Sequence, residues 1–553
     1  MRTARRVARL ALLALVAALA ACQTQTVAAP DYPTLAREAN AGTAVSISAL
    51  REAFLKSADF ADRIDKLVPL EEQAVEQMVD EPLRLGATGS AILDIYFGSL
   101  TGHQALARFY DNLGETESAT AHRDWSARIR ADIESSATGK RESPYRVLSA
   151  SEAMAYLRER NLSPLGSMYH STDNVAFMLI VSARADQGRL DTYYFDLSGA
   201  YEATKRSLPE ADRATFSPGT LIGSLAHRED SAAQVSIGAY LIAQQRYADA
   251  QNWLRAASRT GNVIANVMLA RLYQLQARTL EGKEHDQAME FALEQYLHAI
   301  ALGSDEAMFA LGGLYFEGAY GEDNVDSGIA LLRQAADLGN TDAMLWLGHL
   351  HADGTRVDKS DDLAADYFVR AAEAGDGRAR VSYARFLLDR HDKRAFDPRA
   401  KTWLEEEAKA NDAEAMLLLG NLHAIGVGVS ASNSKALDWY KTAVKTSPDD
   451  ANIVNEVAWT LTVTNLDRLR QSKYALSIMD HVMTKDAEAR KNPAYLDTWA
   501  AAYAANGNFS EAIRVQQEAI TAAESQSDTE VLDVLRQHLE AFQNGKAIID
   551  SVP

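Results

Sequence analysis

Three groups of residues in this 553-residue chain have side chains that could do chemistry. His349 and His351 could bind a metal ion together, and Tyr169-His170-Ser171 places hydroxyl groups beside an imidazole, as nucleophilic catalysis requires. Glu405-Glu406-Glu407 could supply a general acid and a general base. Each group needs particular neighbours to be active, so the surrounding sequence decides how it is interpreted.

None of the three groups has the neighbours that its chemistry needs. His351 and His423 stand where other repeats of the chain have a tyrosine, which favours packing, and no cysteine or clustered carboxylate would complete a metal site. The Tyr-His-Ser run has no nucleophile elbow around it, and three successive glutamates face different directions on a helix. Gly426-Val427-Gly428 has no following lysine to bind a phosphate. We therefore predict no catalytic, metal-binding or cofactor-binding residue and no enzyme activity.

The first 45 residues have the pattern of a secreted protein with a lipid anchor. Four arginines precede an apolar run at residues 10–21 that is too short for an ordinary spanning helix. Leu19-Ala20-Ala21-Cys22 resembles the lipobox of bacterial lipoproteins, which implies cleavage before Cys22, a diacylglycerol on its thiol and an acyl chain such as palmitate on its new amino group. We predict a signal peptide at 1–21 and a lipidated tether at 22–45. The alternative is a chance cysteine at the end of an ordinary signal peptide.

Residue 23 indicates where the protein is located, and the net charge indicates which kinds of molecule it could bind. Gln23 follows the cysteine in place of the aspartate that resembles an inner-membrane retention signal, so we expect an outer-membrane lipoprotein that faces the periplasm. Removal of the four arginines takes the formal net charge from −20 to −24, which argues against binding nucleic acid or an anionic lipid surface. The charge is compatible with basic protein partners, with divalent cations or with a solvated acidic surface.

One helical unit is repeated along the middle of the chain. Alanines recur every 36 residues, a small residue follows five positions later, and a glycine or Asn411 closes each unit, as a left-handed helix end requires. A bulky pair and then small residues lie between these positions, which is typical of two antiparallel helices in close contact. The alanines at the spacing of 36 are Ala307, Ala343, Ala379 and Ala415, and the glycines five positions after an alanine are Gly238, Gly312, Gly348 and Gly420.

The repeated segments, such as AMFALGGLY at 307–315, resemble Sel1-like repeats, which are relatives of the tetratricopeptide repeat (TPR). The resemblance implies an all-α fold, a right-handed helical-repeat solenoid, and is not specific for one function. The second unit has an insertion near residues 279–287, and the fifth departs from the pattern at Arg390. We count six units in residues 211–447, which open at Ala233, Ala265, Ala307, Ala343, Ala379 and Ala415.

Further helices are predicted on both sides of the repeats. Residues 46–142 have the pattern of a helical, TPR-like region, with a helix–turn–helix at 105–129. Residues 448–553 are expected to hold one more helix pair, a TPR at 492–523 and a polar helix at 529–543 that caps the solenoid.

Residues 143–210 have a different pattern, which predicts a small α/β insertion. An apolar run at 175–183 and a second run at 190–197 flank Asp186-Gln187-Gly188, as the strands of a hairpin would flank their turn. The alternative is that residues 175–183 are the buried half of a helix, since periodicity cannot distinguish the two for a short apolar run. A hairpin could offer its edge to a partner strand or could cap the solenoid.

These observations favour a non-enzymatic, lipid-anchored envelope scaffold that mediates protein–protein interactions. The combination of a lipobox with Sel1-like and TPR repeats resembles the scaffold lipoproteins of alginate-type exopolysaccharide export, which implies envelope proteins and a β-barrel porin as partners. A surface-displayed lipoprotein that binds external proteins is a second hypothesis, and an envelope enzyme with its site in residues 143–201 is a third. The sequence does not identify the partner-binding residues.

Overall fold

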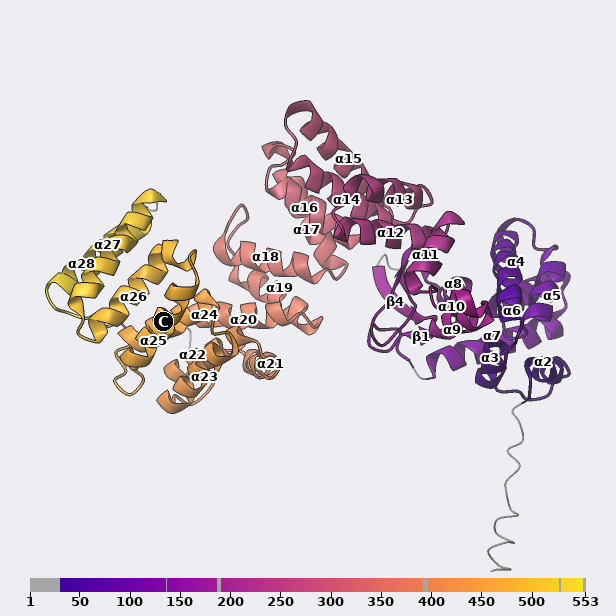
Figure 1. Cartoon of the computed structure of the whole chain (residues 1–553), viewed down its shortest axis with the longest axis horizontal. Helices are drawn as coiled ribbons and strands as arrows, with labels where there is room; N and C mark the ends of the chain where they lie inside the picture. The colour runs from indigo at the N-terminus through magenta and orange to yellow at the C-terminus, as the bar shows by residue number, and fades with distance from the viewer. Residues whose placement is uncertain (1–29, 136, 186–189, 391–395, 527–528, 551–553) are drawn as a thin grey trace, which may run out of the picture. The chain divides into compact units, whose positions relative to one another are not determined.

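The structure is a computed structural model that describes residues 30–135, 137–185, 190–390, 396–526 and 529–550 (Figure 1). The predicted signal peptide, the lipidation site Cys22 and the predicted turn at 186–188 lie outside the described residues. The chain divides into two compact units, Met1–Ala307 and Met308–Pro553. Helices dominate both units, so the predicted fold class, a helical-repeat solenoid, is confirmed.

The first unit begins with six helices that pack on one another. Gly114, with φ of +76°, forms the turn between the last two of them, so the predicted helix–turn–helix at 105–129 is confirmed. Side chains of Asp31, Ser46 and Ser99 cap three of the helices by accepting backbone N–H groups. The helices are α2 (Tyr32–Asn40), α3 (Ile47–Leu55), α4 (Phe60–Asp80), α5 (Leu85–Ile95), α6 (Leu100–Leu113) and α7 (Thr116–Glu134).

A four-stranded sheet follows, in the order β1-β4-β3-β2. β3 and β4 pair antiparallel with Ala183 opposite Asp191, which confirms the hairpin and excludes the helical interpretation of residues 175–183. β2 also runs antiparallel to β3, and the short β1 runs parallel to β4. The elements are β1 (Tyr145–Arg146), α8 (Ala150–Glu159), β2 (Ser163–His170), β3 (Met178–Arg184) and β4 (Leu190–Asp196).

Both edges of this sheet are covered by other parts of the first unit. On β2, the Ser236 hydroxyl accepts from the Tyr169 N–H at 2.8 Å and donates to the Tyr169 carbonyl at 3.0 Å, and Asn262 Nδ2 donates to the Ser167 carbonyl at 2.9 Å. On β1, Arg51 Nη1 donates to the Arg146 carbonyl at 2.7 Å. An edge whose polar groups are paired in this way is closed to a partner strand, so the sheet is a platform for the first repeat helices.

The remaining helices of the first unit lead from the sheet into the repeats. α11 packs against α12 and was not predicted from the sequence. The insertion of the second repeat is accommodated by a 20-residue second helix, α15. The helices are α9 (Ser198–Ser207), α10 (Glu210–Arg213), α11 (Pro218–His227), α12 (Ser231–Ala243), α13 (Tyr247–Arg259), α14 (Val263–Ala277) and α15 (Gly282–Ala301).

The helix pairs of the predicted repeats continue from residue 305. We name the first helix of each pair A and the second B, so that α12, α14, α16, α18, α20 and α22 are A helices. A short 3₁₀ turn, Glu322–Asn324, precedes α17. The helices are α16 (Asp305–Phe316), α17 (Val325–Asp337), α18 (Thr341–Asp353), α19 (Asp361–Glu373), α20 (Gly377–Asp389), α21 (Pro398–Lys409), α22 (Ala413–Ile425) and α23 (Asn433–Thr446).

Residue size sets the packing inside each pair. A Cβ added at Gly348 would lie 2.6 Å from the ring of Phe368, so the A helix can approach its B helix only because this position is small. The six repeat alanines are fully buried at the third residue of each A helix. Gly303 and Asn411, with φ of +89° and +67°, close their units in the predicted left-handed conformation.

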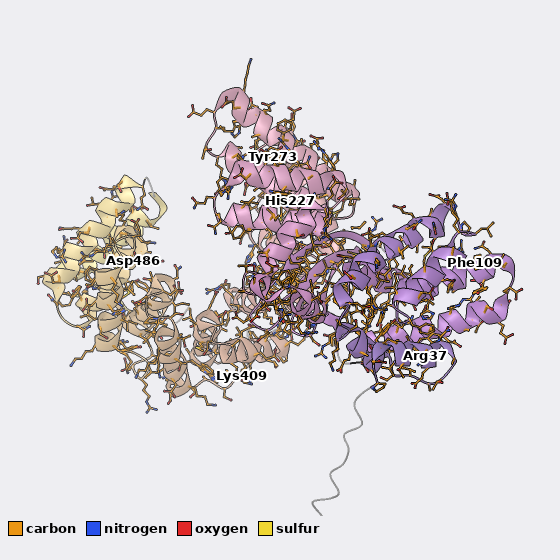
Figure 2. The ribbon with its side chains drawn as sticks, turned by 45° about the vertical axis from the view of Figure 1, so that its right-hand side comes forward. Arg37, Phe109, His227, Tyr273, Lys409 and Asp486 are labelled. Atoms are coloured by element: carbon orange, nitrogen blue, oxygen red, sulfur yellow. The ribbon has the colours of Figure 1, made fainter. Side chains whose placement is uncertain are left out.

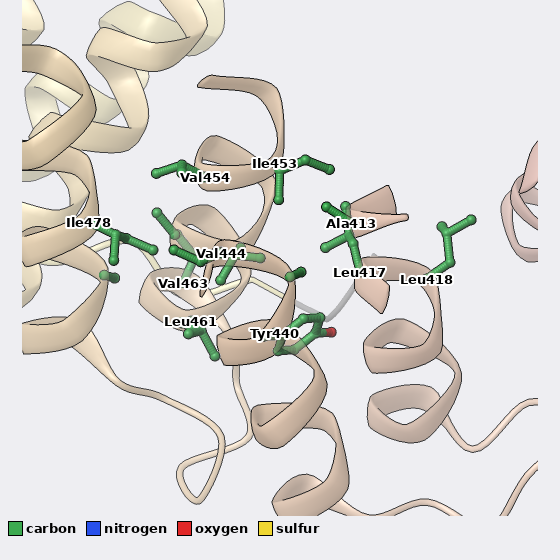
Figure 3. Packing of buried hydrophobic residues seen from close by; sticks show 14 of the residues in the cluster. Ala413, Leu417, Leu418, Tyr440, Val444, Ile453, Val454, Leu461, Val463 and Ile478 are labelled. Atoms are coloured by element: carbon green, nitrogen blue, oxygen red, sulfur yellow. The ribbon is translucent and has the colours of Figure 1, made fainter. Parts of the chain in front are cut away.

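The C-terminal helices complete the second unit as predicted. α24 packs on α25, α26 on α27, and α28 on α27. Figure 3 shows side chains of α22, α23, α24 and α25 directed into one core around Tyr440 and Leu461. The chain returns to α24, where Asp550 forms a bridge with Thr464. The helices are α24 (Ala451–Val463), α25 (Ser472–Lys485), α26 (Pro493–Ala505), α27 (Phe509–Ser525) and α28 (Thr529–Gln543), with a 3₁₀ turn at Ala489–Lys491.

Candidate functional site: the A-helix surface

The histidines that suggested a metal pair lie in packing positions. His351 is 3% exposed, stacks on the Tyr367 ring at 5.9 Å and donates from Nδ1 to the Asp358 carbonyl at 3.0 Å. His349 contacts the Phe368 ring, and burial lowers its pKa. His423 occupies the same slot of its repeat as Tyr273, which Figure 2 labels on α14, and burial lowers its pKa as well. The packing role predicted for His351 is confirmed by these contacts.

Tyr169-His170-Ser171 does not assemble a nucleophile and a base. Tyr169 is buried and its hydroxyl donates to Asp230 at 3.2 Å, whereas His170 and Ser171 are exposed at the end of β2. Burial and then the Asp230 carboxylate raise the pKa of Tyr169. The same Asp230 caps α12, so this tyrosine ties the sheet to the first repeat.

The three glutamates of α21 form ion pairs. Arg380 Nη1 lies 2.9 Å from Glu407 and 3.2 Å from Glu406, and Lys401 lies 2.7 Å from Glu405. Each carboxylate is engaged with a cation, and the three are not arranged as a general acid opposite a general base. The interpretation as a charged surface therefore fits the geometry better than an acid/base pair.

The described residues form neither a metal site nor a membrane-spanning helix. In the part of the chain that the structure describes, no group of three or more histidine, cysteine, aspartate or glutamate side chains is placed to hold a metal ion. None of the described helices is both long enough and apolar enough to cross a membrane.

Ion pairs connect neighbouring A helices across their exposed surface. Arg271 of α14 pairs with Glu306 of α16 at 2.8 Å, and Arg385 of α20 pairs with Glu414 of α22 at 2.9 Å. In both pairs the arginine lies six residues after a repeat alanine, and the glutamate directly precedes the next repeat alanine. The four side chains of these pairs are between 41% and 53% exposed, so solvent reaches both pairs. We call these two pairs the rungs of the A-helix surface.

The second unit has a hollow on this surface between α20, α22 and α24. It encloses about 590 Å³, and Leu417 and Ile453 form the apolar part of its lining. Its single cation, Arg385, is already paired with Glu414. The remaining lining residues are Asn411, Asp412, Ala413, Ser447, Asp450, Asn452 and Glu456. A pocket of this volume suits one or two side chains of a partner.

Sequence analysis did not identify the residues of this hollow. The packing pattern marks buried positions, and it says nothing of which exposed positions meet across neighbouring helices. One signal was available: the residue before the repeat alanine is charged in four units, at Glu306, Asp342, Arg378 and Glu414. A charge that recurs at one exposed register position indicates a shared surface.

Parts of the chain are similar to a known repeat family and to solved structures. The Sel1 repeat model matches residues 305–340, 341–376 and 413–445. Among solved structures, the chain is similar to a Sel1 repeat protein from Oxalobacter formigenes, with 25% identity over 45% of this chain and 98% of that one and a TM-score of 0.36. It is also similar to c5321, a protective antigen of uropathogenic Escherichia coli with an SLR fold, with 14% identity over 92% and 97% of the two chains and a TM-score of 0.44. No curated protein matches the sequence.

The three matched segments are Sel1 repeats, and the helix pairs that contain them belong to a Sel1/TPR-like solenoid. The three matched segments contain the units that open at Ala307, Ala343 and Ala415. The unit between them, which departs from the pattern at Arg390, is not matched. Repeats of this class generally bind other proteins and are typically not enzymes.

Proposed function

We propose that this protein is a non-enzymatic scaffold, anchored by lipid at Cys22 in the outer membrane and facing the periplasm, which holds envelope proteins together. The observation that carries the proposal is the A-helix surface, where exposed charges are held in register and a hollow opens between consecutive helices. The lipobox-like Leu19-Ala20-Ala21-Cys22 supports the anchor. Several acyl chains on one residue give stable attachment, because each buried methylene contributes about 0.8 kcal/mol.

The partner that we propose is a β-barrel porin with other proteins of an exopolysaccharide secretion complex. Support for this step comes from the combination of a lipobox with Sel1-like and TPR repeats, which resembles the scaffold lipoproteins of such systems. The net charge of −20 adds a constraint, because an acidic surface repels a polyanionic polymer. The scaffold would therefore contact the proteins of the complex and not the polymer.

In-cell crosslinking tests the proposed function. The lipidated protein is crosslinked in living cells and purified from the outer membrane, and the recovered proteins are identified by mass spectrometry. We expect a β-barrel porin together with enzymes of polysaccharide synthesis or modification. If no envelope protein is recovered and protease digests the protein on intact cells, the protein is displayed outside and the periplasmic scaffold is wrong.

A separate experiment tests the anchor. Cys22→Ala should leave the fold unchanged and move the protein from the membrane fraction to the soluble fraction, while the matched change Gln23→Ala should leave it in the membrane. Firm membrane attachment of the Cys22→Ala variant would contradict lipidation at this residue.

A further inference from the structure

Rungs join the A helices at two steps, and the step from α22 to α24 is one of the steps that have none. Between α14 and α16, and again between α20 and α22, an arginine from one A helix meets a glutamate from the next. α24 follows α22 in the same way, with Asp450 as its N-cap where Asp412 caps α22. At this step Asn421 stands at the arginine position and Asn452 at the glutamate position. No arginine therefore joins α22 to α24.

One carboxylate at this interrupted step has no cation. Glu456 lies on α24, six residues after the N-cap Asp450, and lines the hollow. Among the described residues it makes no hydrogen bond and no ion pair, and its side chain is exposed. Asp412 and Asp450 also line the hollow, but each is explained as an N-cap of its own helix. Glu456 lies beyond the first turn, so the helix dipole does not account for it.

The neighbouring side chain is suited to a cation. Tyr495 of α26 donates from its hydroxyl to Asn452, and burial and then the charges of Asp450, Asp486 and Glu456 raise its pKa. Tyr495 is half-buried, so part of its side chain is accessible. Lysine and arginine bind where carboxylates and an aromatic ring lie close together.

We propose that the hollow between α20, α22 and α24 binds a segment of a partner protein that presents a lysine or arginine, whose cation pairs with Glu456 where the chain itself lacks the arginine of a rung. The lining supports this occupant over an acidic one, because it has four carboxylates and a single arginine that is already paired. Leu417 and Ile453 can contact the methylene stem of the same side chain. This inference deepens the proposed scaffold function, since it names the site and the chemistry of the partner.

A peptide-binding measurement on the full chain tests the inference. The probe is a fluorescein-labelled eight-residue peptide of alternating lysine and leucine, and the same peptide with glutamate for lysine is the negative control. Binding is followed by fluorescence anisotropy at physiological ionic strength. We expect the lysine peptide to bind and Glu456→Lys to weaken its Kd at least tenfold. The expected weakening for Glu456→Gln is about threefold to fivefold, because the shape is kept and the charge is lost.

Glu290→Lys on α15 is the matched control. Glu290 is an exposed residue within a helix of the first unit, and the substitution changes the net charge by the same amount. We expect less than a twofold change in Kd. Equal weakening by Glu290→Lys and Glu456→Lys would show that the peptide responds only to the net charge, and the site would be wrong. If Glu456→Lys fails to fold, the Kd of Glu456→Gln is compared with that of Glu290→Lys in its place.

The outcomes separate this inference from the proposed function. Recovery of envelope partners by crosslinking, together with unchanged peptide binding in both Glu456 variants, would overturn the site and leave the scaffold standing. Loss of peptide binding only at Glu456, with no envelope partner recovered, would support the site and overturn the envelope complex. Self-association of the chain that Glu456→Lys abolishes would assign the hollow to a second copy and overturn the separate partner.

Discussion

Arginine–carboxylate clusters are buried near the sheet and exposed in the repeats, as Arg51 and Arg378 show. Arg51 of α3 is buried, with Nη2 3.0 Å from Glu152 and Nη1 3.8 Å from Asp132. Arg378 of α20 also meets two carboxylates, Asp342 at 2.6 Å and Asp376 at 2.7 Å, but its side chain is 63% exposed. A guanidinium with two carboxylates is therefore part of the core near the sheet and part of the surface in the repeats.

The difference indicates how each region specifies its structure. Around Arg51, helices α3, α7 and α8 and strand β1 meet at side chains whose charges must be matched, because an unpaired buried charge is costly. In the repeats, the fit between small and large residues specifies the packing, as at Gly348 and Phe368, and the charges lie outside. The repeat surface is therefore free to change its charges for binding, whereas the charges near the sheet are fixed by the fold.

The largest effect is expected at the buried arginine. Arg51→Ala leaves the Glu152 carboxylate, which is 3% exposed, without its cation. We expect a loss of about 3–5 kcal/mol in the free energy of unfolding of the first unit. Urea denaturation of the full chain, followed by tryptophan fluorescence, measures this loss. The double variant Arg51→Met/Glu152→Leu should recover much of it, and a loss below about 1 kcal/mol for the single variant would contradict a buried charge network.

The second prediction concerns the pH dependence of the same buried region. Glu71 is fully buried, accepts from the Ser99 hydroxyl at 2.6 Å and also accepts from Ser151. Burial raises the pKa of Glu71 from its usual 4.5 to about 7. Because the folded pKa is above the unfolded value, the contribution to stability is fully present below pH 4.5 and is lost as the pH rises through about 7. The loss should be on the order of 3 kcal/mol.

Stability measured at pH 4.5, 6 and 8 tests this prediction. Glu71→Gln is the control, because the amide resembles the protonated acid in shape and does not titrate. The variant should lose most of the pH dependence of the first unit. Burial also raises the pKa of Glu152, so a pH dependence of the same sign should remain. A stability that rises from pH 4.5 to 8 would show that Glu71 is ionised in the folded protein.

In the repeats the largest effect should come from a change in size. Gly348→Leu forces a side chain into the Phe368 ring, since even a Cβ would lie 2.6 Å from it. We expect the second unit to lose about 1–3 kcal/mol. Gly223→Leu on α11 is the matched control, because a Cβ there meets nothing within 4 Å. Phe368→Ala in the Gly348→Leu background should restore part of the loss, and equal losses at the two glycines would refute packing by size.

The contrast also explains how much of the fold the sequence predicted. The repeat register, the left-handed closures and the packing histidines follow from local periodicity, because the same contacts recur every 36 residues. The hairpin was predicted from two apolar runs at turn spacing. Each of these features depends on residues that are close in sequence or related by the repeat.

The features that were missed depend on contacts between distant residues. Glu71 and Ser151 are 80 positions apart, and a glutamate is exposed by default, so nothing local indicates its burial. The hollow and its Glu456 arise where helices α20, α22 and α24 meet, and no single helix carries the pattern.

Helix α11 was missed although a local signal for it is present in the sequence. Its N-terminus has a capping box at Ser217 and Thr220.

The smallest effect is expected at Arg378, where the substitution is the same as at Arg51 and the environment is exposed. Arg378→Ala removes ion pairs to Asp342 and Asp376, yet Asp342 stays in contact with solvent and Asp376 still accepts from the backbone N–H of residue 378 as an N-cap. We therefore expect a loss of less than about 1 kcal/mol in the stability of the second unit. A double-mutant cycle with Asp342→Ala should give a coupling of similar size, which falls as salt is added. A loss as large as that at Arg51 would mean that charge fixes the repeats too, and the exposed ion pair between Arg378 and Asp342 would then serve the fold and not the binding of partners.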